Sequence, residues 1–497
     1  MLVACCAALL ALTATAAASE IDGSVTFQVD AAHDGLVTGD SLKPPLKRLW
    51  TRDLGDYTEY SVIAGGRVFA FGPAQNHSIL YALDERTGTT LWSRDLAGWS
   101  LTAPAYDRGK LFTVTDMGIV EAFAADTGAP LWSRQLTGNS SVSAPPTAAN
   151  GVLYIGGANT GGTLFALDEA DGSDKWSQPV ENGSASSPAV DGSNVFVSYV
   201  GPQVYSFDAA SGAPAWHFSG CCEGGGGWAP AIYRGRVYTR DSVYGNHVLD
   251  AATGRDLGSF DATEPPAFSG STGLFLSGST LRARDIDSGS TLWSFTGDGQ
   301  LDTAAIAING TAYIGSSGGN LYGIDIASGK VVWSDALGTG VNGDNEHQFV
   351  FHALSAGDGI LTAPVGSTIV AYSGTEGGGP TPAPAGQPSP APAAGSTNAA
   401  ATWRAALKRD ARRVARAARR FVSGGNAKPL KRAVATMRTH LTRLSSALAR
   451  SESKLRAAIA VERRALRVIA RNTSSQRHPR RIARAVATLT RAVRRSA

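Results

Sequence analysis

Short apolar runs recur along most of the chain, and each is only a few residues long. They are rich in β-branched and aromatic residues, and clusters of Gly, Ser and Asn separate them. Helical repeats would instead space their apolar residues at the period of a helix. The clearest runs are residues 67–71, 110–115, 152–156, 194–199, 236–239 and 311–315. This pattern predicts an all-β fold made of short strands.

A longer phrase repeats together with these runs. It contains two apolar or small residues, an Asp, a turn that ends in Gly, and then a Trp, as in Leu83 to Gly88 followed by Trp92. The turn glycines are Gly88, Gly128, Gly172, Gly212, Gly254, Gly289 and Gly329, and their spacings are 40, 44, 40, 42, 35 and 40 residues. A repeat of this length is typical of a four-stranded propeller blade.

The residue types of the phrase suit a hairpin between the third and fourth strands of a blade. An Asp side chain accepts hydrogen bonds from turn amides, and a Gly adopts positive φ without steric cost. We therefore interpret the repeated acids as turn caps and not as catalytic acids; they are Asp84, Asp168, Asp208, Asp250, Asp285 and Asp325. The Trp is expected on the outermost strand, where its ring fills the wedge between blades.

Counting the Trp positions predicts eight blades. The positions are Trp50, Trp92, Trp132, Trp176, Trp216, Leu257 (a substituted copy), Trp293 and Trp333. Trp50 has no preceding strands of its own, and the last repeat ends near Tyr372 before reaching a Trp strand. We expect the segment from Lys47 to Trp50 to supply the missing outer strand, which closes the ring and removes the open edge.

These motifs resemble the pyrroloquinoline-quinone-like (PQQ-like) β-propeller repeat family. The family includes the propeller lipoprotein of the outer-membrane assembly machine and the quinoprotein dehydrogenases. The resemblance covers residues 24–375, and the segment from Phe27 to Gly35 resembles the lead-in of exported propellers of this kind. It implies an eight-bladed propeller but not one function, because a single scaffold hosts many roles.

Composition divides the rest of the chain. Residues 1–18 carry no charge and resemble the apolar part of a signal peptide, whereas residues 376–398 are a Pro/Gly/Ala linker. Residues 399–497 hold 27 Lys and Arg against three acids, a net charge of +24, while the remainder carries −20. Apolar residues at alternating spacings of four and three predict a basic helical tail, as a bundle or a coiled coil; they are Leu430, Val434, Met437, Leu441, Leu444 and Leu448.

Adjacent cysteines form the first candidate site. Cys221 and Cys222 precede four glycines and Trp228, in a loop between the outer strand of one blade and the inner strand of the next. In an exported protein such a pair would oxidise to a vicinal disulfide. The disulfide either stiffens the loop or, as the resemblance to quinoprotein dehydrogenases implies, lies with Trp228 against a quinone. The calcium ligands of those enzymes have no matching motif here.

The longest such loop, Gly338 to His352, is the second candidate. Its Glu346, His347 and His352 are possible ligand-binding residues, as is Trp99 in the equivalent loop of another blade. A loop of this polarity is also compatible with simple solvation, and a Trp at this place with packing. No catalytic residue and no metal site are predicted.

Two functions follow as hypotheses. The first is an exported, envelope-associated binding or scaffold propeller without a cofactor. Its residues 399–497 would contact envelope proteins, anionic wall or lipid polymers, or its own acidic propeller, whereas intracellular nucleic acid is not expected as a partner. The alternative is an oxidoreductase that binds PQQ and calcium near Cys221 and Cys222.

Overall fold

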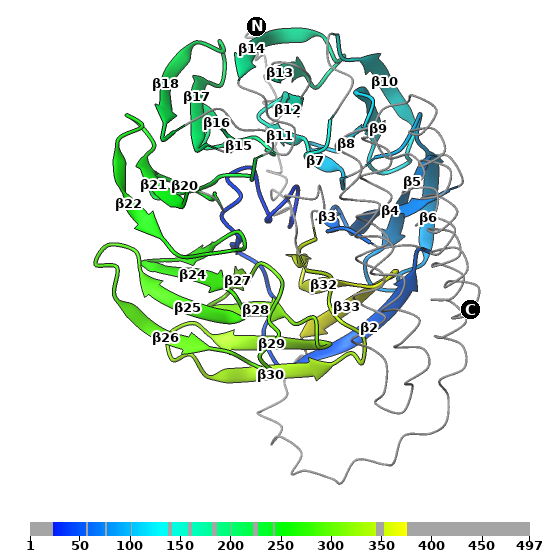
Figure 1. The fold of residues 1–497 in the computed structure, drawn as a ribbon. Helices are drawn as coiled ribbons and strands as arrows, with labels where there is room; N and C mark the ends of the chain where they lie inside the picture. The colour runs from blue at the N-terminus through cyan, green and yellow to red at the C-terminus, as the bar shows by residue number, and fades with distance from the viewer. Residues whose placement is uncertain are drawn as a thin grey trace, which may run out of the picture. The chain divides into compact units, whose positions relative to one another are not determined.

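The computed structural model describes residues 23–55, 58–74, 77–100, 102–137, 142–157, 162–180, 186–199, 201–221, 227–241, 244–343 and 352–374. Within these ranges every regular element is a β-strand, so none of the described residues forms a membrane-crossing helix. The strands form eight sheets arranged as blades around a central axis (Figure 1). The predicted eight-bladed propeller is confirmed. The predicted signal peptide, linker and helical tail lie outside the described residues.

Each blade is an antiparallel sheet, and we number the blades 1 to 8 along the chain from β3. Blade 1 contains β3 (Val62–Ala64), β4 (Arg67–Pro73), β5 (Ser78–Asp84) and β6 (Thr90–Asp95). Blade 2 contains β7 (Ala105–Asp107), β8 (Lys110–Val114), β9 (Ile119–Ala124) and β10 (Pro130–Gln135). Blade 3 contains β11 (Thr147–Ala149), β12 (Val152–Gly157), β13 (Gly162–Asp168) and β14 (Asp174–Val180). Blade 4 contains β15 (Ala189–Val190), β16 (Asn194–Tyr199), β17 (Gln203–Asp208) and β18 (Pro214–Ser219).

The second half of the ring repeats this order with two additions from the N-terminal region. Blade 5 contains β19 (Ala231–Tyr233), β20 (Arg236–Thr239), β21 (Asn246–Asp250) and β22 (Asp256–Phe260). Blade 6 contains β23 (Ala267–Ser269), β24 (Thr272–Ser277), β25 (Thr280–Asp285) and β26 (Thr291–Phe295). Blade 7 contains β27 (Ile306–Ile308), β28 (Thr311–Gly315), β29 (Asn320–Asp325) and β30 (Val331–Ala336), with β1 (Leu36–Val37) added in parallel to β27. Blade 8 contains β31 (Ser355–Gly357), β32 (Ile360–Val365), β33 (Thr368–Gly374) and β2 (Leu46–Asp53).

The ring closes as the sequence predicts. Strand β2 pairs antiparallel with β33, so that the strand carrying Trp50 becomes the outer strand of blade 8. Figure 1 shows the blue β2 beside the yellow β33, although the two are far apart in the sequence. Joining the first and last parts of the ring within one sheet leaves no blade incomplete, and closure of this kind protects the edges of a propeller.

The repeated Asp residues cap turns, as predicted. Asp84 accepts hydrogen bonds through Oδ1 from the Thr87 amide at 2.8 Å and the Thr87 hydroxyl at 2.7 Å, and the Gly88 amide donates to the Asp84 carbonyl at 2.8 Å. The same carboxylate-to-turn bonds recur at Asp168, Asp208, Asp250, Asp285 and Asp325. Hydrogen bonds from the Ser211 hydroxyl and amide hold the pKa of Asp208 below its usual value. Asp208 therefore stabilises its turn in the charged form.

An N-terminal segment, residues 23–37, crosses the centre of the ring and contacts every blade (Figure 1). The Ser24 amide donates to Ala356 in blade 8, and the Ile63 amide of blade 1 donates to Ser24. Backbone bonds to β7, β15, β19, β23 and β27 follow; they are Tyr106 to Val25, Val190 to Ala31, Ile232 to Ala32, Phe268 to Asp34 and Ala307 to Gly35, at 2.6–3.1 Å. Blade 3 is reached through the Thr26 hydroxyl, which donates to Pro146. One segment thus ties all eight inner strands together.

A ring of Trp side chains joins the blades on their outer side. The indole Nε1 of each Trp donates to a backbone carbonyl of the next blade at 2.7–3.1 Å; the Trp residues are Trp50, Trp92, Trp132, Trp176, Trp216, Trp293 and Trp333. Six of the rings lie against the turn glycine of the next blade, where a Cβ would come within 2.7 Å of the indole; the glycines are Gly88, Gly128, Gly172, Gly212, Gly254 and Gly329. The predicted packing role of the Trp is confirmed.

The prediction that Leu257 stands at the Trp position of blade 5 is wrong by one residue. In blade 5 the residue opposite Val248 is Gly258, just as Trp92 is opposite Ala82 in blade 1. Gly258 is also four residues after its turn glycine, the same spacing as in the other copies. A bulge before this position sets which residue faces the next blade. The missing Trp is therefore replaced by Gly258, and Leu257 lies on the exposed side of the strand.

Candidate functional site

The sequence-predicted site residues are only partly described. Trp99 is 39% exposed in the loop between β6 and β7, and Cys221 is exposed after β18. Trp228 and His352 are buried. Cys222, Glu346 and His347 lie outside the described residues, so the vicinal disulfide and the ligand roles of the long loop stay predictions.

Trp228 lies shortly before β19, the first strand of blade 5. Its carbonyl accepts a hydrogen bond from the Ser198 hydroxyl at 2.6 Å and from the Ser186 hydroxyl at 3.5 Å. Both serines are buried in blade 4. These contacts fix the end of the Cys221 loop to the neighbouring blade.

His352 holds the base of the long loop. Its Nδ1 lies 2.9 Å from the Gly343 carbonyl, which holds these two described residues of the loop side by side. Asn342, beside this pair, donates to the Thr58 and Gly366 carbonyls at 3.1 and 3.0 Å and accepts from the Gly366 amide at 2.9 Å. The described part of this loop is therefore fastened by hydrogen bonds to blades 8 and 1.

No group of three or more His, Cys, Asp or Glu among the described residues is arranged to hold a metal ion. Glu59, before β3, has a carboxylate oxygen that is shielded from solvent and lacks a hydrogen-bond partner within the described ranges, and burial raises the pKa of Glu59 to about 8. A mostly protonated carboxyl at neutral pH is a poor calcium ligand.

A cavity of about 680 Å³ opens where the N-terminal segment meets blades 2 to 5. Asp30, Asp34, Asp107, Asp191 and Arg234 are among its lining residues. Burial is the main cause that raises the pKa of Asp30 to about 6 and that of Asp34 to about 8, and the Asp30 charge adds to the shift of Asp34. The segment that joins the blades therefore also carries carboxyls that resist ionisation.

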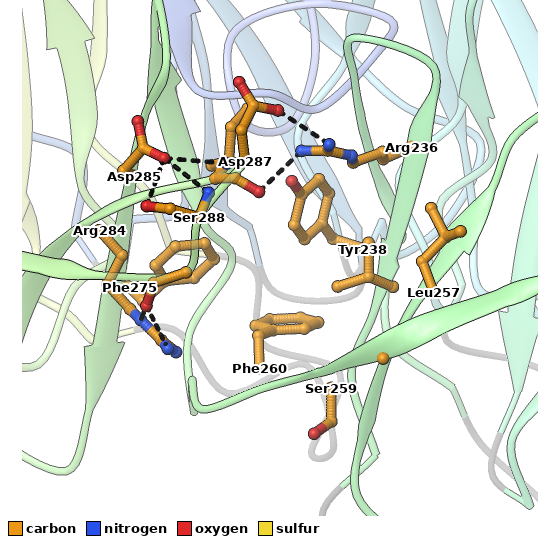
Figure 2. Close-up of a pocket in the computed structure, with 14 residues that line it drawn as sticks. Arg236, Tyr238, Leu257, Ser259, Phe260, Phe275, Arg284, Asp285, Asp287 and Ser288 are labelled. Carbon is orange, nitrogen blue, oxygen red and sulfur yellow. Dashed lines mark hydrogen bonds and ion pairs between the residues drawn. The ribbon is translucent and has the colours of Figure 1, made fainter.

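The break in the Trp ring produces a second cavity, which we call the interblade pocket. It lies between blades 5 and 6 and has a volume of about 410 Å³, within the range of about 300–1,000 Å³ typical of small-ligand sites. Strand β22, with Gly258, forms one side, and the turn from Asp285 to Gly289 forms the other (Figure 2). A Cβ on Gly258 would meet no atom within 4 Å, so the space next to it is open.

A guanidinium takes the hydrogen-bonding place of the missing indole. In six of the seven other interfaces the Trp donates to the carbonyl of the residue three positions before the turn glycine, for example Ala125 before Gly128 in blade 2 or Ile326 before Gly329 in blade 7. The corresponding carbonyl in blade 6 belongs to Ile286, and it accepts from Arg236 Nη1 at 2.8 Å. Arg236 Nη2 also bonds to Asp287 Oδ1 at 2.8 Å. Arg236 therefore replaces the hydrogen-bond donor of the missing Trp, but it does not replace the flat indole ring.

Aromatic side chains partly fill the space from the inner side. Phe275 of β24 stands at a register position where the other blades carry Ala, Thr, Ile or Val. Its ring lies 5.5 Å from that of Phe260, which in turn lies 5.5 Å from Tyr238 (Figure 2). These separations are in the favourable range for aromatic pairs. The three rings form the floor of a pocket whose mouth has no Trp.

Sequence reasoning missed this pocket. The available signal was the constant spacing of four residues between turn glycine and Trp, which identifies Gly258, not Leu257, as the exception. The roles of Arg236 and Phe275 depend on contacts between blades, which the repeat pattern alone does not reveal.

Comparison with known proteins places this architecture in a family of PQQ-like propellers. A family model described as outer membrane protein assembly factor BamB matches residues 46–182, 116–257 and 160–355. These matches together cover more than half of the chain, and the chain belongs to this family.

Solved structures share the fold at low sequence identity. BamB from Moraxella catarrhalis is 18% identical with a TM-score of 0.51, and the match covers 66% of this chain and 99% of that one. Quinohemoprotein alcohol dehydrogenase ADHIIG from Pseudomonas putida HK5 is 13% identical with a TM-score of 0.58, over 78% of this chain and 85% of that one. These likenesses show the fold alone.

A curated relative matches only in part. The serine/threonine-protein kinase AfsK of Streptomyces griseus is 29% identical over 165 residues, which is 30% of this chain. The match spans only 20% of the length of that kinase.

Proposed function

We propose that this protein is a binding and scaffold module of the cell envelope. The observation that carries the proposal is the way residues 23–37 tie the inner strands of all eight blades into one closed ring. A ring fastened in this way holds loops and interblade surfaces in fixed positions, as a scaffold requires. The family's description as an outer-membrane assembly factor supports a role with protein partners outside the cytoplasm.

The basic C-terminal region would provide attachment. Residues 399–497 carry a net charge of +24, whereas the rest of the chain carries −20. A segment with this charge attracts anionic wall polymers or lipid headgroups through counterion release and surface potential. It could instead bind an acidic partner or the protein's own propeller.

Fractionation of cells that produce the full chain tests the location, and we expect the protein in the envelope fraction. Binding to anionic liposomes and to wall fragments is then compared for the full chain and a chain without residues 399–497. The full chain should bind at low salt and release as salt rises, whereas the truncated chain should not bind. Equal binding by the two chains would refute the tether, and a cytoplasmic location would refute the envelope role.

The quinoprotein alternative has a separate test. The purified protein is mixed with PQQ and calcium, and bound chromophore and dye reduction with alcohols are measured. Cofactor binding at micromolar concentration, together with dye reduction, would replace the scaffold proposal with an oxidoreductase. We expect neither.

A further inference from the structure

We propose that the interblade pocket binds an aromatic side chain, Trp above all, of a partner polypeptide that carries an acidic residue beside it. The inference rests on the proposed function as a binding module and names the chemistry of one of its contacts. The molecule itself supplies the comparison, because seven other blade interfaces show which group fits at this place.

The first step concerns shape. In six of the seven other interfaces, an indole lies against the turn glycine of the next blade. At Gly289 the corresponding Cβ position has only Arg284 Nη2 near it, at 3.8 Å, so the glycine surface is not covered by a ring. The pocket retains this glycine and the turn around it, and it adds Phe260, Phe275 and Tyr238 as a floor (Figure 2). A planar ring that entered would contact aromatic faces on one side and the glycine backbone on the other.

The second step concerns hydrogen bonding. The Ile286 carbonyl lies where an indole donor would be received, and Arg236 uses one of its acceptor sites. A carbonyl oxygen has two lone pairs and accepts a second donor. An indole N–H can therefore be recognised here as it is in the other interfaces, which favours Trp over Phe or Leu.

The third step concerns charge. Asp287 is paired with Arg234 and Arg236, at 3.6 and 2.8 Å. Arg284, which also lines the pocket, donates to the Gly289 carbonyl, and no ion pair to a carboxylate is found for it among the described residues. One lining cation is thus available to an anion at the mouth of the pocket. A carboxylate beside the inserted aromatic residue complements this charge.

The probe is the blocked peptide acetyl-Gly-Trp-Glu-Gly-amide with a fluorinated indole, and fluorine NMR measures its affinity for the full chain. We expect saturable binding, and replacing the Trp of the peptide by Leu should weaken it about tenfold in competition, a difference of about 1.4 kcal/mol. Replacing the Glu by Gln should weaken it by about two- to fivefold, the range for an exposed ion pair. Equal affinity of the Trp and Leu peptides would overturn the proposal.

Variants locate the binding. Gly258→Trp restores the repeat and should abolish binding. Because Gly258 has φ of 133°, where side chains are strained, the variant could fail to fold. Leu257→Glu is therefore the second variant, since Leu257 is 39% exposed and lines the pocket, so that the new charge should repel the acidic peptide. Leu292→Glu is the matched control, because Leu292 is one residue before Trp293 and 52% exposed on the next blade. It should leave binding unchanged.

The outcomes separate this inference from the proposed function. If Leu257→Glu and Leu292→Glu affect peptide binding equally, the pocket is not the site and the inference fails. Envelope association of the full chain is measured on the same two variants by fractionation. If the unmodified protein associates with the envelope but does not bind the peptide, the pocket proposal is overturned and the scaffold proposal stands. If neither the unmodified protein nor the variants associate with the envelope, while the unmodified protein binds the peptide, only the scaffold proposal is overturned.

Discussion

The inner and outer rings of this propeller are built by opposite strategies. The outer ring depends on a repeated residue, because seven of the eight blades each contribute a Trp to the next interface. Blade 5 has Gly258 in place of that Trp. The inner ring depends on a single non-repeated segment, residues 23–37, which bonds to every blade including blades 5 and 6. The difference shows how one outer contact can be given up: the two blades beside the gap remain joined through Ala32 and Asp34 on the inside.

The interface between blades 5 and 6 differs from the other interfaces in more than the missing Trp. Arg236 supplies the donor, and Phe275 adds bulk at a position where other blades are smaller. The Arg236 hydrogen bond keeps the Ile286 carbonyl satisfied, and an unpaired buried acceptor there would be costly. The surface that remains is a pocket and not a collapsed interface, which is the arrangement expected at a place that receives a partner.

The largest effect should come from removing a Trp that seals an intact interface. Trp176 is 9% exposed, and its Nε1 donates to the Ala209 carbonyl at 3.0 Å. Trp176→Ala should lower the free energy of unfolding by about 3–5 kcal/mol, as for other large-to-small core changes. Chemical denaturation measures it, with Leu131→Ala as the control, since Leu131 is 47% exposed on an outer strand. A loss below about 1 kcal/mol would show that the outer ring contributes little stability.

Two turn glycines provide a sharper comparison of sealed and open interfaces. Gly128 and Gly289 have φ of 65° and 73°, so an Ala at either would suffer the same strain, about 1–2 kcal/mol. A Cβ at Gly128 would also lie 2.6 Å from the Trp92 ring, whereas at Gly289 nothing is closer than 3.8 Å. Overpacking adds about 1–3 kcal/mol to Gly128→Ala alone.

We therefore expect Gly128→Ala to destabilise the protein more than Gly289→Ala by the overpacking amount. Thermal and chemical unfolding of the two variants measure the difference. Equal losses would mean that the turn of blade 6 is covered as tightly as that of blade 2, contrary to the open interblade pocket.

Features of this fold that repeat along the chain can be predicted from the sequence, whereas features that do not repeat cannot. The blade count, the turn caps and the closing strand depend on residues that recur at fixed spacing, so the pattern predicts them. The central path of residues 23–37 has no period, and its partners lie up to hundreds of residues away, as with Ser24 and Ala356. The pairing of Arg236 with Ile286 likewise depends on two blades meeting. The sequence predicts Leu257 at the Trp position of blade 5, but Gly258 stands there because a bulge sets the register of β22.

The next effect concerns Arg236, the hydrogen-bond donor that takes the place of the missing indole between blades 5 and 6. Arg236→Met removes the hydrogen bond to the Ile286 carbonyl and the ion pair with Asp287. We expect a loss of about 1–2 kcal/mol, since a partly buried acceptor loses its partner. In a Gly258→Trp background the restored indole supplies the donor, and the same change should then cost less than about 0.5 kcal/mol. A double-mutant cycle measures the coupling, and additive effects would show that Arg236 does not replace the indole.

The smallest effect concerns the inner ring, at the residue that bonds to blade 6. Burial, with the Asp30 charge, raises the pKa of Asp34 to about 8 in the folded protein, against 3.8 as the ordinary value. The unfolded chain therefore releases this proton at lower pH than the native chain, so the group makes folding less favourable as pH rises from about 4 to 8. Asp34→Asn can keep the acceptor for the Leu36 amide, at 2.8 Å, and cannot ionise.

Asp34→Asn should leave stability unchanged near pH 4 and increase it steadily toward pH 8. Because the carboxyl lines an open cavity, we expect a gain on the order of 1 kcal/mol, below the 1.4 kcal/mol that each full unit of pKa shift would give. Denaturation curves at several pH values measure it, with Asp191→Asn on the same cavity as the control. A gain that is already present at pH 4 would have another cause than the proton. A loss that grows with pH would mean that the inner ring uses the charged form, and the comparison between the two rings would then have to include an electrostatic contact at their centre.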